Sequence, residues 1–148
     1  MPVVRNPQFY FREGFCWTNI LNPDARLLKT KLKNKSVNDV GSMSLYSQYK
    51  ITPDFYVVSL LNSEFLFDYY RVFINCTVNI QINDIRQMPI IIPNSNQLCN
   101  FKNLFDKAYV IKIMQFENKI SEIEAEKQIK ILQIQLENLV EDLYQINR

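Results

Sequence analysis

The sequence predicts an α+β fold, in which a small strand-rich part with one buried helix is followed by a long helical C-terminal tail. Three features of the 148-residue chain support this prediction. Residues 1–53 are rich in aromatic and turn-forming residues, residues 55–70 are apolar on most sides, and neither glycine nor proline occurs in residues 95–148. We therefore divide the chain into a strand-rich domain over residues 1–94 and a helical tail over residues 95–148.

Four segments define the elements expected after the first strands. Thr52-Pro53-Asp54 predicts a helix start, because a hydroxyl residue precedes a proline at the first helical position and an acid in the first turn. The apolar segment from Phe55 to about Tyr70 is then expected to be one helix buried on several sides. Alternation of apolar and polar residues over 78–83 predicts a half-buried strand, and the proline-bounded run 88–93 predicts an edge strand or a connector.

The tail contains two helical patterns that do not share a register. In the later pattern, apolar residues step by three and four, as in a coiled coil or a helical hairpin. Ser121-Glu122-Ile123-Glu124 fits a capping box that begins a separate helix. The tail is therefore predicted to be two helices with a break near residues 116–121, or one bent helix. We call its regularly spaced apolar residues the seam; they are Ile129, Leu132, Leu136, Leu139, Leu143 and Ile146.

The composition excludes most classes of enzyme. The chain has no histidine, so it has no Ser-His-Asp triad, Cys-His pair or His-Glu-x-x-His zinc site. Its two glycines, Gly14 and Gly41, cannot form a glycine-rich phosphate loop. Asn6-Pro7-Gln8-Phe9 approaches the Asn-Pro-Pro-Tyr/Phe motif of amino-methylating DNA methyltransferases, but Gln8 replaces the second proline, and we predict a turn before a strand. We expect no cofactor and no catalysis by this chain alone.

The cysteines and the apolar segments bear on location. Cys16, Cys76 and Cys99 are odd in number and far apart, which predicts buried free thiols in a reducing compartment. The apolar stretches are shorter than the ~20 residues that a membrane span needs, and no secretory segment follows Met1. We expect a cytoplasmic protein without a membrane partner.

Positive charge is concentrated in the first part of the chain. Residues 1–60 carry eight basic and four acidic residues, whereas residues 61–100 and 101–148 each have a net charge of −1. This asymmetry suggests an anionic partner for the first third of the chain.

A row of alternating lysines is the leading candidate for contacts with phosphates. On one strand, all four would lie on one face and follow a nucleic-acid backbone; equally, they would protect a solvated edge strand from pairing. Other candidates for contacts near bases lie among polar and aromatic residues that also fit an ordinary amphipathic strand. The phosphate candidates are Lys29, Lys31, Lys33 and Lys35, and the base candidates are Arg12, Arg26, Ser44, Tyr46 and Gln48.

Four segments in order resemble one known family. Tyr10 to Ile20 (YFREGFCWTNI) is similar to the pattern y-f-k-e-G-i-x-W-s-x-i. Leu60 to Ser63 (LLNS) is similar to a family helix with the sequence L-L-N-S. Thr77 to Ile90 (TVNIQINDIRQMPI) is similar to t-x-n-x-q-x-x-d-i-x-x-l-P-i, and Leu136 to Tyr144 (LENLVEDLY) to i-d-x-l-V-y-x-L-Y. Over residues 6–146, the chain thus resembles the TaqI-like C-terminal specificity domain of type II restriction–modification DNA methyltransferases.

The resemblance implies a function as well as a fold. It implies that residues 1–94 are a target-recognition domain that reads a short sequence of double-stranded DNA, and that residues 95–148 are a helical spacer or docking tail. Catalysis would belong to an N-terminal methyltransferase or nuclease domain of a restriction–modification protein, adenine-specific by the same resemblance. No base-reading residue can be carried over, because the matching residues are expected to hold the scaffold: Trp17, Asn62, Asn79, Asp84 and Pro89.

A function of a different class remains open. The seam in the tail would also suit a protein–protein module that forms a homodimer through its C-terminal helix and has no role on DNA.

Overall fold

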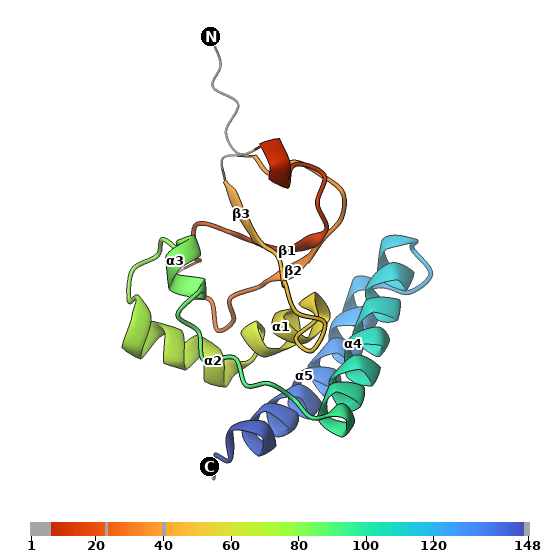
Figure 1. Cartoon of the computed structure of the whole chain (residues 1–148). Coiled ribbons are helices and arrows are strands. Elements are labelled where there is room, and N and C mark those ends of the chain that lie inside the picture. The colour runs from red at the N-terminus through yellow and green to blue at the C-terminus, as the bar shows by residue number, and fades with distance from the viewer. Residues whose placement is uncertain (1–6, 23, 40, 147–148) are drawn as a thin grey trace.

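The computed structural model describes residues 7–22, 24–39 and 41–146. These residues form an α+β fold, as predicted: a three-stranded antiparallel sheet lies over two short helices, and a hairpin of two long helices packs beside them (Figure 1). Asn6 of the Asn-Pro motif lies outside the described residues. Pro7–Phe9 forms a short 3₁₀ turn (η1) ahead of the first strand, in agreement with the predicted turn.

The sheet has one face toward the core and one face toward solvent. Its strands are β1 (Gly14–Thr18), β2 (Lys31–Lys33) and β3 (Ser42–Leu45), in the order β2-β1-β3. Phe15 pairs with Leu32 and Leu45, while Cys16 pairs with Lys31 and Ser44. Because paired residues point to the same side of a sheet, Phe15 faces the core and Cys16 faces the opposite side, which we call the outer face.

The apolar segment after Pro53 forms two helices, so the expectation of one helix was wrong. These are α1 (Asp54–Leu61) and α2 (Glu64–Tyr69), and a π-helical turn (η2, Tyr70–Ile74) continues α2. The buried hydroxyl of Ser63 accepts a hydrogen bond from the Leu66 amide at 3.3 Å and thereby starts a new helix. The sequence between Leu61 and Glu64 is thus a helix boundary inside an apolar run.

Asn62 joins the end of α1 to the residue that precedes β2. Its amide Oδ1 accepts from the Thr30 N–H at 2.7 Å, and its Nδ2 donates to the Thr30 carbonyl at 2.8 Å. Trp17, which is 2% exposed, donates from its indole to the Ile80 carbonyl at 3.4 Å. The expectation that these two motif residues hold the scaffold is confirmed.

The predicted strand over residues 78–83 is absent from the described part of the chain. Asn79 forms only an isolated bridge with Ile20, and α3 (Ile82–Ile85) begins three residues later. The Asp84 carboxylate accepts from the Gln81 N–H at 2.8 Å, which caps this short helix, and from the Asn75 side chain at 2.8 Å. Asp84 is therefore a scaffold residue, as expected.

The proline-bounded segment after α3 is a connector. The hydroxyl of Tyr56 donates to the Ile91 carbonyl at 2.8 Å, and the hydroxyl of Tyr144 donates to the Pro89 carbonyl. These two hydrogen bonds fix the connector between α1 and the end of the last helix.

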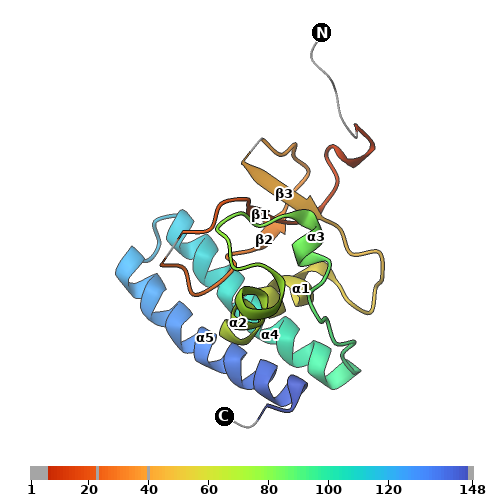
Figure 2. The same cartoon turned by 90° about the vertical axis from the view of Figure 1, so that its left-hand side faces the viewer.

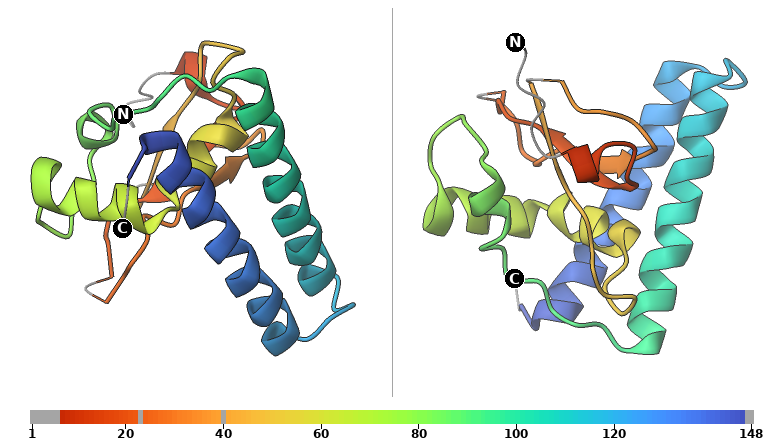
Figure 3. Two further views of the ribbon diagram at one scale, coloured as in Figure 1. Left: turned by 90° about the horizontal axis from the view of Figure 1, so that it is seen from below. Right: turned by 45° about the horizontal axis from the view of Figure 1, so that its top comes forward.

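The tail is a helical hairpin with the predicted break. Helices α4 (Ser95–Phe116) and α5 (Glu122–Tyr144) lie side by side and antiparallel, and Ser121 caps α5 (Figure 2). The distal half of the hairpin extends away from the other elements when the molecule is seen from below (Figure 3, left).

The hairpin and the sheet share one hydrophobic core. Phe101 of α4 meets Tyr56 of α1 edge-on at 5.0 Å between ring centroids, and both side chains are almost fully buried. Leu136 and Leu143 of the seam are also buried in this core. The boundary after residue 94 is therefore the start of a helix and not a division between two cores.

Replacing Asn62 by Ala should destabilise the protein. Asn62→Ala leaves the N–H and carbonyl of the buried Thr30 without their partners, at a cost of about 2–3 kcal/mol in the free energy of unfolding. Urea unfolding measures this change. The matched control Asn100→Ala, at an exposed position on α4, should change stability by less than about 0.5 kcal/mol. Equal midpoints for the two variants would contradict the role of Asn62.

A second expected outcome concerns alkaline pH. Burial raises the pKa of Tyr144 from an ordinary value of 10.0 to about 12. Between these values, the unfolded chain loses a proton that the folded chain retains, so this tyrosine lowers the free energy of unfolding as pH rises. The stability difference between the wild type and Tyr144→Phe should therefore narrow as the pH rises from about 10 to about 12 in denaturant titrations. A difference that stays constant over this range would show that the pKa is not raised.

Candidate nucleic-acid interface

An open hollow of about 420 Å³ lies beside β3. It is bordered by η1, by the loop that precedes β3, and by α3, which packs beside this strand. Aromatic rings and polar groups line it together, which distinguishes this surface from the apolar core. Its polar lining comes from Lys33, Ser36, Asn38, Ser42, Ser44 and Arg86.

Beside the hollow, an exposed arginine lies against two stacked aromatic rings. The rings of Phe9 and Tyr46 are stacked at 5.6 Å with an angle of 12° between their planes. The guanidinium carbon of Arg12 lies 5.0 Å from the Tyr46 ring centroid and 5.9 Å from that of Phe9. The Tyr46 hydroxyl also donates to the Phe9 carbonyl at 3.2 Å. We call Phe9, Arg12 and Tyr46 the arginine stack.

Gly14 makes room for this stack. A Cβ atom at Gly14 would lie 2.5 Å from Cδ1 of Tyr46 and 2.5 Å from the carbonyl oxygen of Leu45. Such distances are far inside van der Waals contact, so Tyr46 can cross β1 here only because the residue beneath it has no side chain.

Lys33 is buried beneath the same residues, with only 5% of its surface exposed. Its ammonium donates to the carbonyls of Arg12 at 2.8 Å and Ser36 at 2.6 Å, and it lies 5.9 Å from the Tyr46 ring centroid. A buried ammonium with carbonyl acceptors is a structural group. Lys33 therefore connects the start of β1 to the loop after β2, and its charge does not face solvent.

The four lysines do not form one row, so that expectation was wrong. β2 contains only Lys31 and Lys33 of the set. Lys29 precedes the strand in a left-handed conformation with φ of 52°, and Lys35 follows the strand. Lys29, Lys31 and Lys35 are exposed, so these three retain accessible charges.

The other candidates fall into two groups. Ser44 and Tyr46 line the hollow, and Arg12 lies against the Tyr46 ring. Ser44 accepts a 2.6 Å hydrogen bond from the Asn38 side chain. Arg26 belongs with Lys29 to the segment between β1 and β2, at the end of the sheet opposite Gly14. Gln48 is exposed beyond the end of β3 and does not line the hollow.

Three residues at this surface were not among the candidates from the sequence. Phe9 completes the arginine stack, Asn38 holds Ser44, and Arg86 lies at the end of α3 on the far wall of the hollow. Arg86 is exposed and has a 3.4 Å contact with the side chain of Asn83. No local pattern signals Arg86, because it reaches the hollow only through the packing of α3 against β3.

The thiols are free, but only Cys16 is buried, so the expectation of three buried thiols was wrong. Cys76 and Cys99 are exposed. Burial raises the pKa of Cys16, against the opposing effect of Lys31 and Lys33, so this thiol is neutral at pH 7. Among the described residues, no group of three His, Cys, Asp or Glu side chains is placed to hold a metal ion.

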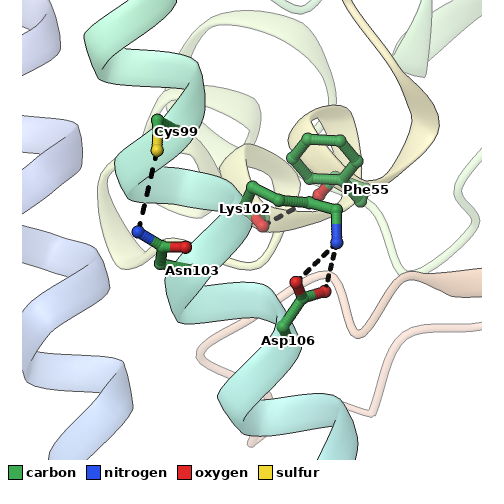
Figure 4. Close-up of polar contacts among 6 residues, drawn as sticks. Phe55, Cys99, Lys102, Asn103 and Asp106 are labelled. Atoms are coloured by element: carbon green, nitrogen blue, oxygen red, sulfur yellow. Dashed lines mark hydrogen bonds and ion pairs between the residues drawn. The ribbon is translucent and has the colours of Figure 1, made fainter.

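A separate polar cluster lies where α4 packs on α1. Lys102 pairs with Asp106 one turn along α4 at 2.5 Å, and its ammonium lies 5.5 Å from the Phe55 ring centroid (Figure 4). In the same view, Asn103 contacts the sulfur of Cys99 at 3.7 Å. An exposed pair of this kind contributes roughly 0.3–0.5 kcal/mol and leaves no net charge for a ligand.

Comparisons with known proteins add no assignment. No model of a protein family matches the chain, and a search of curated proteins found no significant match either. Within the described part of the chain, no helix combines the length and the apolar character that a bilayer span requires.

The space above Gly14 yields a stability test. Gly14→Ala should lower the free energy of unfolding by about 1–3 kcal/mol, because the new methyl group displaces Tyr46 or the backbone of β3. The control is Gly41→Ala, where the nearest atom would be the Asp39 carboxylate at 3.6 Å. Chemical denaturation of both variants compares the two sites. A Gly14 variant as stable as the Gly41 variant would mean that Tyr46 does not lie over β1.

Proposed function

We propose that the chain recognises double-stranded DNA, as the target-recognition domain of a type II restriction–modification methyltransferase or endonuclease. Its partners are then a DNA duplex and the N-terminal catalytic domain of the parent protein. The observation that carries this proposal is the hollow beside β3, which is lined by Ser44, Tyr46 and Arg86. The exposed Arg12 lies against the Tyr46 ring.

The chemistry of this surface suits a division between phosphates and bases. Exposed lysines such as Lys31 and Lys35 supply charge that is independent of sequence, which is the role of phosphate contacts. The guanidinium, hydroxyl and amide groups of Arg12, Ser44 and Asn38 are types that read base edges in the major groove. With a net charge of only +2, the isolated chain should bind weakly and with strong salt dependence.

The location of the four resembling motifs supports the same proposal. Trp17, Asn62 and Asp84 make long-range hydrogen bonds that hold the fold. The loop and strand over residues 34–48, which supply much of the hollow, lie between the first and second motifs. A recognition domain would keep its scaffold and vary such a segment with its target.

A dimerisation module through the helical tail is the alternative function. Most of its seam packs inside this chain, since Leu136 and Leu143 are each less than 10% exposed. Other apolar side chains of the hairpin stay exposed, among them Phe116 at 92% and Ile123 at 69% near the turn and Ile134 at 64% farther along α5. Analytical sedimentation measures whether the chain is a dimer, and a gel shift at low salt measures its affinity for DNA. A dimer with no affinity for DNA would favour the alternative.

The DNA proposal is tested by paired lysine variants. Lys31→Ala with Lys35→Ala should weaken binding to all duplexes alike and reduce the slope of log affinity against log salt by about 2, since each lost phosphate contact contributes about 0.9. Fluorescence anisotropy with labelled duplexes at several NaCl concentrations measures both effects. Lys33 is left unchanged because its ammonium is structural.

The matched control changes the same number of charges elsewhere. Lys127→Ala with Lys130→Ala, both exposed on α5, should leave the salt slope as in the wild type. If the two double variants showed equal slopes of log affinity against log salt, Lys31 and Lys35 would not contact DNA phosphates. A folded wild-type protein that does not bind any duplex in dilute buffer would refute the proposed function.

A further inference from the structure

We propose that Arg12 is the residue that determines specificity for one guanine, which it binds through two parallel hydrogen bonds from its guanidinium. This inference rests on the proposed function and adds a base and a residue to it. It arises from the arginine stack, where a charged side chain lies against Phe9 and Tyr46, two rings that line the hollow.

The backbone that carries Arg12 is fixed from two sides. Phe11 has a φ of 56°, in the left-handed region that bulky residues seldom adopt, and its N–H donates to the Ser36 carbonyl at 3.3 Å. The carbonyl of Arg12 accepts from the buried ammonium of Lys33 at 2.8 Å. The Cα position of Arg12 is thus set by contacts with the loop that follows β2.

The side chain is restrained as well. Its guanidinium carbon lies 5.0 Å from the Tyr46 ring centroid and 5.9 Å from that of Phe9, and cation–π attraction to these rings limits its movement. Within the described residues, no hydrogen bond or ion pair engages the N–H groups of this guanidinium. The nearby Asp54 carboxylate feels the charge of Arg12, but it accepts its hydrogen bond from the Ser47 N–H at 2.9 Å.

An arginine fork can pair with a phosphate or with a guanine, and only the guanine contact carries sequence information. Phosphate contacts need charge, and a mobile lysine such as Lys31 provides it without a defined orientation. The O6 and N7 acceptors of guanine lie side by side, and the fork of an arginine is the usual partner for them. The neighbouring Asn38 and Ser44 are uncharged groups joined by a 2.6 Å hydrogen bond, which is also the chemistry of base edges.

The experiment selects binding sites from a library of randomised DNA duplexes, with the 148-residue chain and with three variants. The wild type should enrich sequences that contain guanine at one position. Arg12→Lys keeps the charge but loses the fork, so its preference for that guanine should fall roughly 10- to 100-fold while its affinity for unrelated duplexes stays within about twofold. Arg12→Ala should lose the same preference together with some general affinity.

Lys31→Ala is the matched control, since it should weaken binding to all sequences and leave the selected site unchanged. Thermal unfolding of each variant confirms that it is folded at the binding temperature. If Arg12→Lys and Arg12→Ala both select the wild-type site with wild-type preference, the inference is refuted while DNA recognition stands. It is also refuted if the wild type binds duplexes with no sequence preference. Absence of any duplex binding by the wild type would instead refute the proposed function itself.

Discussion

The arrangement of the candidate interface depends on the buried ammonium of Lys33. A charge removed from water is stable only where the protein replaces its hydration, and carbonyls on both sides of this lysine do so. These carbonyls belong to Arg12, just before β1, and to Ser36, in the loop after β2. One side chain therefore sets the distance between two segments that border the hollow, and its ammonium also lies near the Tyr46 ring. The position of the arginine stack follows from it.

The outer face of the sheet is largely polar because the hydrophobic core lies on the other face. Trp17, Tyr56 and Phe101 belong to one apolar cluster that extends from β1 through α1 to α4. A sheet of three short strands would be unstable without such a backing. The helical tail packs on α1 and α2, so it supports the sheet through these two helices. The outer face can then consist of lysine, serine and tyrosine without loss of stability.

The sequence predicted those elements whose ends are encoded locally. Ser121 marks the start of α5 because a hydroxyl cap stands between two apolar patterns of different register. Ser63 has the same role ahead of α2, but apolar residues surround it and conceal the boundary. Residues 78–83 alternate as a strand would, yet the side chain of Asp84 caps α3 and the strand is not formed. In both failures, a side-chain hydrogen bond to the backbone overrides the apolar pattern.

The candidate site was less predictable, because charge and alternation do not show which polar groups are already paired. Lys31 and Lys33 lie on the same face of β2, so a count of charges in the sequence cannot distinguish their roles. They differ because the Lys33 ammonium donates to the backbone carbonyls of Arg12 and Ser36, whereas Lys31 has no such partners among the described residues. These hydrogen bonds depend on segments that the fold brings together. Scaffold residues such as Asn62 and Asp84 are constrained by contacts of this kind. Exposed side chains such as Lys31 and Arg86 make few contacts within the fold, so the physics of folding places few limits on them, and their role must be found by binding experiments.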